Sequence, residues 1–152
     1  MDFSKTINYK ISDLAALHRT ELEKSLSGVN IHSGQVFILF ELWVEDGLSQ
    51  TDLAKNLKLS APTINKMVKG LSDAGFIILK RSESDGRLVH VFLSEKGKQV
   101  KSGVENIWHD LESKITIYLT ETEKLILLQL LEKVLLYFYN DSDKKIISIF
   151  RG

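Results

Sequence analysis

Residues 48–93 read LSQTDLAKNLKLSAPTINKMVKGLSDAGFIILKRSESDGRLVHVFL, and the helix and turn signals in this segment organise the whole chain. Ser49 and Asp52 have capping-box spacing, in which each side chain bonds the backbone N–H of the other residue at the start of a helix. Ser60 is a second favourable helix start, and Pro62 fits the first turn, where its missing N–H needs no partner. The sequence therefore predicts a short helix, a tight turn around 58–60 and a second helix.

A β-hairpin is predicted directly after the second helix. Gly75 suits the left-handed residue that ends a helix. Two apolar strands are then expected, Phe76–Arg81 and Leu88–Leu93, around the polar tip 82–87. Helix, turn, helix and hairpin together form a winged helix-turn-helix, a unit that presents one helix to the major groove of DNA. The expected fold class is mainly α with a small β-hairpin wing, that is, α+β.

The second helix of this unit has two different faces. Ile64, Met67, Val68 and Leu71 recur at helical spacing and are expected to pack inward. The Asn, Thr and Lys side chains on the other face can hydrogen-bond base edges or phosphates. A merely solvated face is the alternative for an isolated helix, but the capped helix before it and the hairpin after it favour DNA binding. The candidate DNA-binding residues are Ser60, Pro62, Thr63, Asn65, Lys66, Lys69, Arg81 and Arg87.

The hairpin also carries a family signature. Residues 85–94, DGRLVHVFLS, resemble the wing of the MarR (multiple-antibiotic-resistance regulator) family, which reads Asp-x-Arg, five residues, then Leu-Ser/Thr. Residues 49–54 and 60–64 resemble its helix-turn-helix, and 94–97 resemble the entry to its next helix. The element order is similar over nearly the whole chain, with motif-level likeness between 48 and 97.

This resemblance implies a homodimeric transcriptional regulator, usually a repressor, often released from DNA by a small ligand or an oxidant. It gives Arg87 a minor-groove contact and Asp85 a role in supporting the wing. Gly86 between them is expected to permit the tight turn. A solvated hairpin tip is the alternative.

Composition narrows the class of protein. A length of 152 residues predicts one domain, 1–152, and a hydrophobic content of 43% is enough for a core. No apolar run approaches the length of a membrane span and no secretory leader is seen, so a cytoplasmic protein without membrane contact is expected. The absence of cysteine excludes disulfides and thiolate metal ligands, and it departs from the oxidation-sensing branch of the family.

Catalytic and metal sites are not expected. The four histidines, at 18, 32, 90 and 109, lie in four different predicted elements without ligand-pair spacing. No HExxH, nucleophile-elbow or phosphate-loop pattern occurs. We therefore expect no enzyme, no cofactor and no metal.

Charge is distributed unevenly although the net charge is zero. Residues 48–101 hold ten Lys/Arg and five Asp/Glu, a net charge of +5, and the remainder has −5. Basic residues are thus concentrated in the lobe 48–93 and just beyond it, where phosphate contacts would need them.

Helices outside this lobe are expected to form a dimer. A first amphipathic helix is predicted from roughly Lys5 to Leu26. A second is predicted from near His32 or Ser33 to Gly47, and a long one after Ser94, running to about Ile115. Thr120 and Glu123 form another capping box, and the helix after it is apolar on several faces. Since so small a chain cannot bury all of them, we expect segments 5–28 and 116–150 to be dimerisation helices.

An effector site is expected beside the predicted helix that ends at Gly47, because one face of this helix is aromatic. Phe40 and Trp43 lie on that face, and His18 interrupts the apolar stripe of the first helix. The resemblance places an effector pocket near these elements, and an aromatic or phenolic small molecule is the expected ligand. The alternative for all three residues is a role in the core or an interface.

The sequence is compatible with three classes of function. The favoured one is a sequence-specific DNA-binding regulator, a ligand-responsive repressor that binds a pseudo-palindromic operator as a homodimer. The alternative is a winged-helix protein-interaction module without DNA binding, which would normally expose more aromatic side chains on the second helix. An enzyme is the third and least supported.

Overall fold

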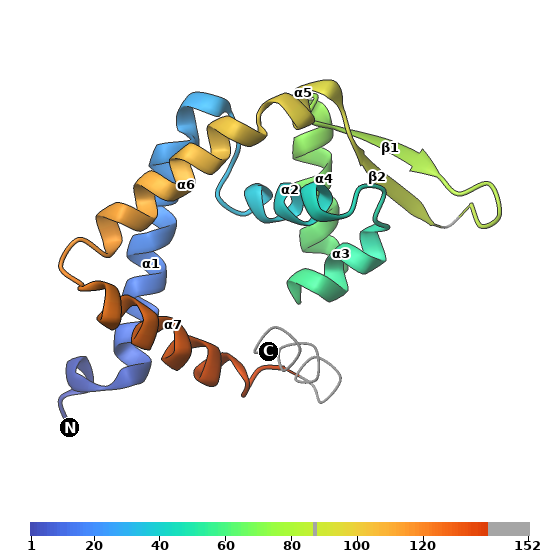
Figure 1. Ribbon diagram of the computed structural model, residues 1–152. Helices are drawn as coiled ribbons and strands as arrows, with labels where there is room; N and C mark the ends of the chain where they lie inside the picture. Colours follow the sequence, from blue (N-terminus) through green and yellow to red (C-terminus); the bar gives the residue numbers. More distant parts are fainter. Residues whose placement is uncertain (87, 140–152) are drawn as a thin grey trace. The chain divides into compact units, whose positions relative to one another are not determined.

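The computed structural model describes residues 1–86 and 88–139. It is mainly helical with one antiparallel hairpin, which confirms the predicted fold class (Figure 1). In chain order the elements are η1 (Phe3–Lys5), α1 (Ile7–Leu26), η2 (Ser27–Val29), α2 (Gln35–Val44), α3 (Gln50–Leu57), α4 (Ala61–Asp73), β1 (Ile77–Arg81), β2 (Val89–Leu93), α5 (Glu95–Gln99), α6 (Lys101–Ile115) and α7 (Glu121–Leu135).

The chain forms two compact units, Met1–Leu111 and Glu112–Gly152. The first unit contains the helix-turn-helix, the hairpin, α1, α2 and most of α6. The second contains the end of α6 and α7.

The predicted helix starts are confirmed. Ser49 and Asp52 form a complete capping box, with Asp52 N–H donating to Ser49 Oγ at 3.0 Å and Ser49 N–H donating to Asp52 Oδ2 at 3.2 Å. Ser60 caps α4, with Pro62 in the first turn. Between the two helices Lys58 adopts a left-handed φ of 53°, which produces the tight turn. Local side-chain-to-backbone bonds therefore position both helices of the motif.

The end of α4 is a Schellman motif. Phe76 N–H donates to Leu71 O and Gly75 N–H to Ser72 O, both at 2.9 Å, and Gly75 has a φ of +79°. Because the N–H of Phe76 is committed to the helix end, β1 begins at Ile77 instead of the predicted Phe76. Leu88 likewise uses its N–H in the hairpin turn, donating to Asp85 O at 2.9 Å, so β2 begins at Val89.

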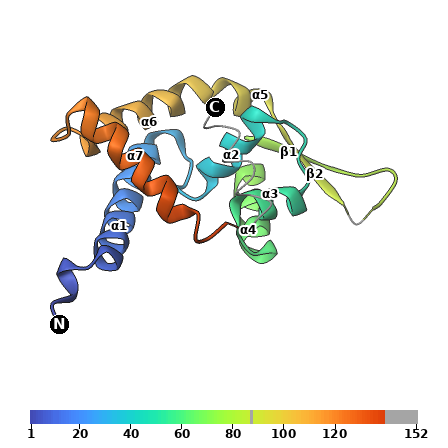
Figure 2. The same ribbon diagram turned by 60° about the horizontal axis from the view of Figure 1, so that its bottom comes forward.

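The hairpin pairs Ile77 with Leu93 and Arg81 with Val89 in antiparallel register. It extends away from α3 and α4 in both views (Figures 1 and 2). A third segment, not predicted, pairs with the other edge of β2: Val91 N–H donates to Leu48 O at 2.9 Å, and Gly47 N–H donates to Val91 O at 3.1 Å. The base of the wing is thus attached to the start of α3.

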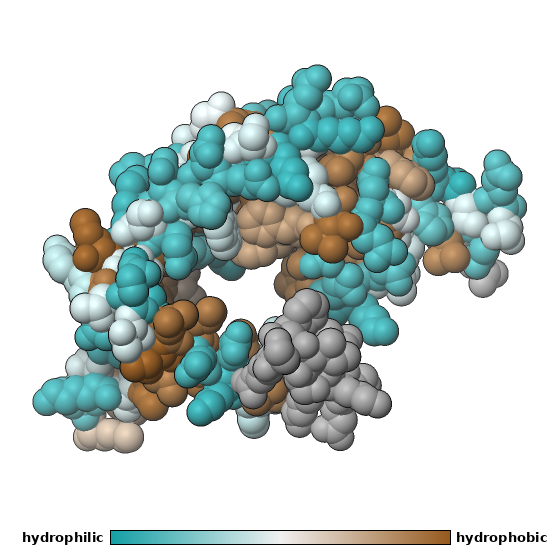
Figure 3. Space-filling model, viewed as in Figure 1, coloured by the Kyte–Doolittle hydropathy of each residue, from teal (hydrophilic) through white to brown (hydrophobic). Residues whose placement is uncertain are grey.

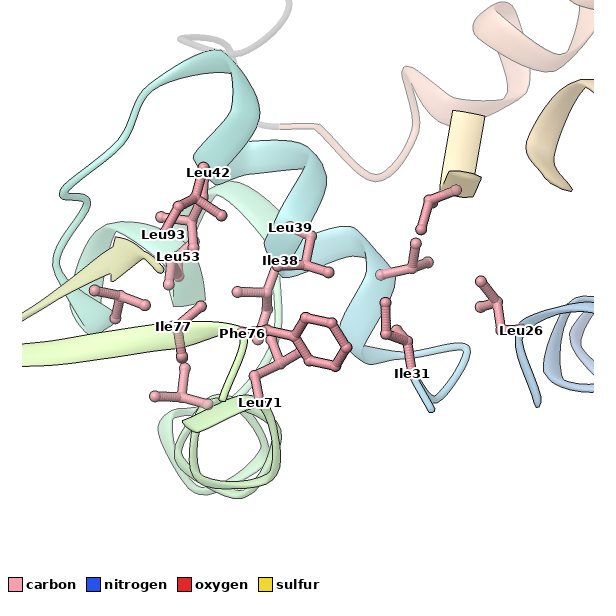
Figure 4. Close-up of a cluster of buried hydrophobic side chains, with 14 of the residues drawn as sticks. Leu26, Ile31, Ile38, Leu39, Leu42, Leu53, Leu71, Phe76, Ile77 and Leu93 are labelled. Atoms are coloured by element: carbon pink, nitrogen blue, oxygen red, sulfur yellow. The ribbon is translucent and has the colours of Figure 1, made fainter. Parts of the chain in front are cut away.

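Buried apolar side chains from five helices, α1, α2, α3, α4 and α6, and from both strands form the core of the first unit. Figure 4 shows Phe76 between Ile38 of α2 and Leu71 of α4. Phe76 is only 1% exposed, and burying a side chain of this size contributes roughly 1.5–3 kcal/mol. The core therefore holds α2 directly beneath the helix-turn-helix and the wing.

Two of the predicted helices differ from those in the structure. The helix expected from Ser94 to Ile115 is interrupted at Val100, so that α5 and α6 are separate. The second helix begins at Gln35 and ends at Val44, not at Gly47. Its end is early because Asp46 Oδ1 accepts N–H bonds from Leu93 at 2.8 Å and Gly47 at 3.0 Å, which tie the chain to β2.

Helix α7 buries none of its residues. Its apolar side chains appear as brown surface in the space-filling view (Figure 3). The large apolar side chains on it with at least a third of their surface exposed are Leu125, Ile126, Leu127, Leu128, Leu130, Leu131, Val134 and Leu135. Among the helices of the described residues, none has the length and apolar character that crossing a membrane requires.

Candidate functional site

The outer face of α4 is polar and accessible. Asn65, Lys66 and Lys69 are exposed, whereas Ile64 and Val68 on the opposite face are fully buried. The predicted inward face is thus confirmed for the residues that anchor the helix. Lys69 Nζ lies 2.6 Å from Asp73 Oδ2, so its charge is already paired within the helix. Asn65 and Lys66 are the more available of the three for a base or a phosphate.

The first turn of α4 commits two of its candidate side chains to capping. Thr63 N–H donates to Ser60 Oγ at 3.4 Å, and the two hydroxyls lie 2.8 Å apart. Pro62 is exposed beside them. Ser60 and Thr63 therefore shape the helix start, while a hydroxyl oxygen can still accept or donate one further bond.

The wing tip is organised by short-range bonds. Asp85 N–H donates to Ser82 Oγ at 3.3 Å, and Arg81 is exposed where β1 ends. Gly86 was expected to be needed for the tight turn. It does not adopt a left-handed φ, and a Cβ there would meet nothing within 4 Å, so the turn does not require glycine at this position. Arg87, the proposed minor-groove residue, lies outside the described residues.

Two of the three effector candidates, His18 and Phe40, meet at an aromatic side chain that the sequence did not single out, Trp108. The Trp108 ring lies 6.0 Å from His18 and 5.0 Å from Phe40, between ring centroids and edge to face in each case. Phe40 in turn lies 5.8 Å from Trp43, and Phe37 joins the same cluster. Trp108 follows Val104 at helical i, i+4 spacing, which could have revealed it.

A cleft of about 300 Å³ opens beside this cluster, at the lower end of the size range of small-molecule sites. Phe40 and Trp43 line it, whereas His18 and Phe37 do not. Its remaining lining residues are Val44, Lys101, Glu105, Trp108 and His109. The walls are thus aromatic and aliphatic on one part, and the other side chains are charged or titratable, with Lys101 Nζ 3.8 Å from Glu105 Oε1.

A second, larger cleft of about 1070 Å³ runs along α4 and the start of α2. Pro62, Thr63 and Lys66 border it on one side. Behind it Gly70 faces the buried Gln35, whose Oε1 accepts the His32 N–H at 2.9 Å. The glycine lets α2 approach α4 closely, so α2 supports α4 directly.

Glu23 of α1 fastens the segment that precedes α2. Its two carboxylate oxygens lie 2.6 Å from His32 Nδ1 and from the Ser33 backbone nitrogen. The hydrogen bond with His32, followed by that from the Ser33 N–H, lowers the pKa of Glu23 from 4.5 to about 2. No spacing rule predicted this connection, because it joins two separate elements.

Metal ligation finds no support in the described residues: along 1–86 and 88–139, no group of three His, Asp or Glu side chains is placed to hold an ion.

Comparison with known proteins points to one family. Residues 31–89 match the model of the MarR family. The chain is 27% identical over 122 residues to the transcriptional regulator BilQ of Clostridium symbiosum, covering 80% of this chain and 82% of BilQ. It is 29% identical over 92 residues to the regulator TtmR of Methylorubrum extorquens, covering 60% of this chain and 47% of TtmR. This chain therefore spans about half the length of TtmR but most of BilQ.

A solved structure shares the fold. A Listeria monocytogenes protein assigned to the MarR family of transcriptional regulators, in complex with a 26mer DNA, superposes with a TM-score of 0.76 at 25% identity. The superposition covers 86% of this chain and 87% of that one.

The polar face of α4, the hairpin beside it and these relatives define a DNA-binding transcriptional regulator with a winged helix-turn-helix, and not an enzyme. The family model, the curated regulators and the solved structure together support a MarR-family winged-helix regulator.

Proposed function

We propose that two copies of this chain bind a pseudo-palindromic operator and repress transcription, and that a small aromatic or phenolic molecule regulates the binding. Within each copy α4 enters the major groove, and the β1–β2 wing reaches the neighbouring minor groove. The lobe 48–93 is the DNA-binding part of a single domain. The segments 5–28 and 116–150, of which 140–150 lie outside the described residues, join the two copies. The protein acts in the cytoplasm, where operator DNA is accessible.

The observation that carries this proposal is the exposed outer face of α4. Because the opposite face of α4 is buried in the core, the orientation of the helix is fixed and Asn65 and Lys66 lie on its exposed side. An amide can make two hydrogen bonds to an adenine edge, and a lysine can bond guanine or a phosphate. The net charge of +5 on residues 48–101 favours approach to a polyanion.

Dimerisation is supported by the apolar surface of α7. Leu125 is 64% exposed and Leu128 is 57% exposed within a single chain. Contiguous exposed leucines on one helix are typical of a surface that another subunit covers. Two copies related by a twofold axis would read two half-sites about one helical turn apart, ~34 Å.

Effector binding is supported by the cleft beside Trp43 and Trp108. Its aromatic walls offer stacking to a planar ring, and Lys101 and His109 can bond a hydroxyl or an anionic group. His18 does not line the cleft but supports it through Trp108. Phe40 and Trp43 are therefore the stronger contacts among the three candidates.

The alternative, a protein-interaction module without DNA binding, is not favoured. On α4 the outward residues are an amide and two ammonium groups rather than the aromatics that protein interfaces prefer. The Listeria relative of the same fold was solved with DNA.

Selection from a library of random duplexes tests the proposal. The protein should enrich one family of sequences with twofold symmetry, and the enriched duplex should bind two chains. Recovery of unrelated sequences, bound no better than the starting library, would overturn the operator and leave only nonspecific binding.

A further inference from the structure

The first residues of α5 fasten the junction at which α4 passes into β1. Ser94 Oγ donates to Gly75 O at 2.6 Å, and Ser94 N–H donates to Phe76 O at 3.0 Å. Lys96 Nζ donates to Ala74 O at 2.7 Å and lies 4.2 Å from the centre of the Phe76 ring. A cation at the C-terminal end of α4 also interacts favourably with the helix dipole. Every residue of the junction 74–76 is therefore bonded to α5.

Gly97 brings the backbone of α5 against the same junction. Its N–H donates to Ser94 Oγ at 3.0 Å, and a Cβ at this position would overlap the carbonyl oxygen of Phe76. Gly97 is buried. No side chain can separate α5 from the junction here, so a displacement of α5 would move the junction with it.

One side chain ties this arrangement to α2. Trp43 Nε1–H donates to Gly97 O at 3.0 Å across 54 residues of sequence. The indole is partly buried, packed 5.8 Å from Phe40, and it lines the aromatic cleft. Trp43 in the cleft is thus hydrogen-bonded to Gly97, and Gly97 lies directly against the α4–β1 junction.

We infer that Trp43 is a positioning residue for DNA binding: its indole N–H holds α5, and α5 holds the orientation of α4 relative to the wing. This inference rests on the proposed function, because it matters only if α4 and the wing bind DNA at once. The physical reason is geometric. The major groove and the neighbouring minor groove are fixed on the duplex, so a change of angle at Gly75 costs one of the two contacts.

Substitutions at Trp43 and Phe37 separate this role from packing. Trp43→Phe removes the indole N–H and keeps a ring. The control Phe37→Leu removes a ring from the same cluster at a position that does not line the cleft and has no side-chain hydrogen bond to lose. Both proteins should remain folded in thermal melts. Affinity is measured for a duplex selected by the wild type from the random library, and for an unrelated duplex.

We expect Trp43→Phe to weaken binding of the selected duplex roughly tenfold, the scale of one lost hydrogen bond. Binding of the unrelated duplex should be nearly unchanged, because phosphate contacts tolerate small changes of angle. Phe37→Leu should bind both duplexes like wild type. A merely structural role for Trp43 would lower the melting temperature and leave the preference intact. A folded Trp43→Phe protein that keeps the wild-type preference overturns the inference.

A second measurement decides the matter if Trp43→Phe does not fold. The two indole N–H signals of the wild type are followed by NMR and assigned with the Trp108→Phe protein. Saturation with the selected duplex should shift the Trp43 signal. DNA bound to α4 and the wing would displace the junction and α5 slightly, and this would change the hydrogen bond of the Trp43 indole N–H. An unmoved Trp43 signal overturns the inference. If the wild type selects no duplex at all, the proposed function fails and this inference falls with it.

Discussion

At the scale of single residues, backbone conformation and local charge decide how the elements are joined. Lys58 in the turn between α3 and α4 and Gly75 at the end of α4 both adopt a left-handed φ. Glu23 holds two consecutive residues of the segment that leads into α2. These residues bind no ligand in the proposal, but they set the direction in which the functional elements leave the core.

Gly75→Ala should destabilise the protein by about 1–2 kcal/mol, the cost of a left-handed conformation for a residue with a Cβ. The cost is conformational, since the added Cβ would come no closer than 4.0 Å to Lys96 Cδ. Urea denaturation measures the free energy of unfolding. Gly86→Ala is the matched control and should be nearly neutral, because its φ is not left-handed and its surroundings are open. Equal stability of the two variants would contradict the prediction.

The Glu23 carboxyl should titrate near pH 2, well below its usual 4.5, in carbon-detected NMR. Because the folded pKa is depressed, the stabilisation from Glu23 is complete above about pH 4.5 and is lost as pH falls toward about 2. His32→Ala removes the largest cause and should raise the pKa toward its ordinary value. In acid melts the difference between wild type and Glu23→Gln should shrink over the same window. A wild-type midpoint near 4.5 would show that the bonds to His32 and Ser33 do not form in solution.

At the scale of elements, α4 and the wing differ in how they are supported. The core beneath α4 fixes its face, and Gln35 of α2 backs it at Gly70. The wing is held at its base by Leu48, Asp46 and α5, while its tip projects. The helix is therefore built for a defined register on base edges, and the tip for a flanking contact.

Asn65→Ala and Lys66→Ala should each weaken operator binding by ~1–3 kcal/mol if the side chains reach base edges. Each variant should also lose its preference at one base position, measured by binding to a panel of single-base operator changes. Neither should lower stability, since both side chains are exposed. A uniform loss across all duplexes would place the residue on phosphate instead.

Arg87→Ala should weaken operator binding and flatten its dependence on salt. Two lost phosphate or groove contacts per dimer would reduce the log–log slope by roughly 2. Asp85→Ala should have a milder effect, because it loosens the wing without removing a cation. Lys114→Ala near the end of α6 is the control for the charge change. Binding by Arg87→Ala that equals wild type at every salt concentration would remove the wing tip from the DNA interface.

At the scale of the whole molecule, α7 is the helix whose apolar side chains stay exposed in a single chain. A complete capping box starts it, with Glu123 N–H donating to Thr120 Oγ1 at 3.3 Å, yet none of its residues is buried. Local bonds alone rarely stabilise an isolated helix of this length in water. Its apolar surface therefore calls for burial in an assembly.

Leu128→Glu should dissociate the proposed homodimer at micromolar concentration and weaken operator binding together. A buried leucine contributes roughly 1.5–3 kcal/mol, so the dimer affinity should fall at least about tenfold. Light scattering gives the mass. Gln129→Glu is the matched control, as it adds the same charge to an exposed neighbour on α7. A wild-type protein that is monomeric at this concentration would contradict the dimer.

The local features of this protein followed from the sequence by itself. The capping boxes at Ser49 and Thr120, the Gly75 helix end and the two faces of α4 were predicted, because each depends on residues three to five positions apart. The wing was predicted from its apolar strands and its resemblance to a family signature. These signals are periodic or adjacent, and a reading of the chain can find them.

Only the tertiary structure decided which distant residues work together. Trp43 meets Gly97, Asp46 meets Leu93, and Leu48 pairs with β2, each across more than forty residues. Such bonds have no characteristic separation along the sequence, because core packing and not helix or strand geometry brings the partners together. For the same reason Trp108 emerged as the centre of the aromatic cluster only when α1, α2 and α6 were packed against one another.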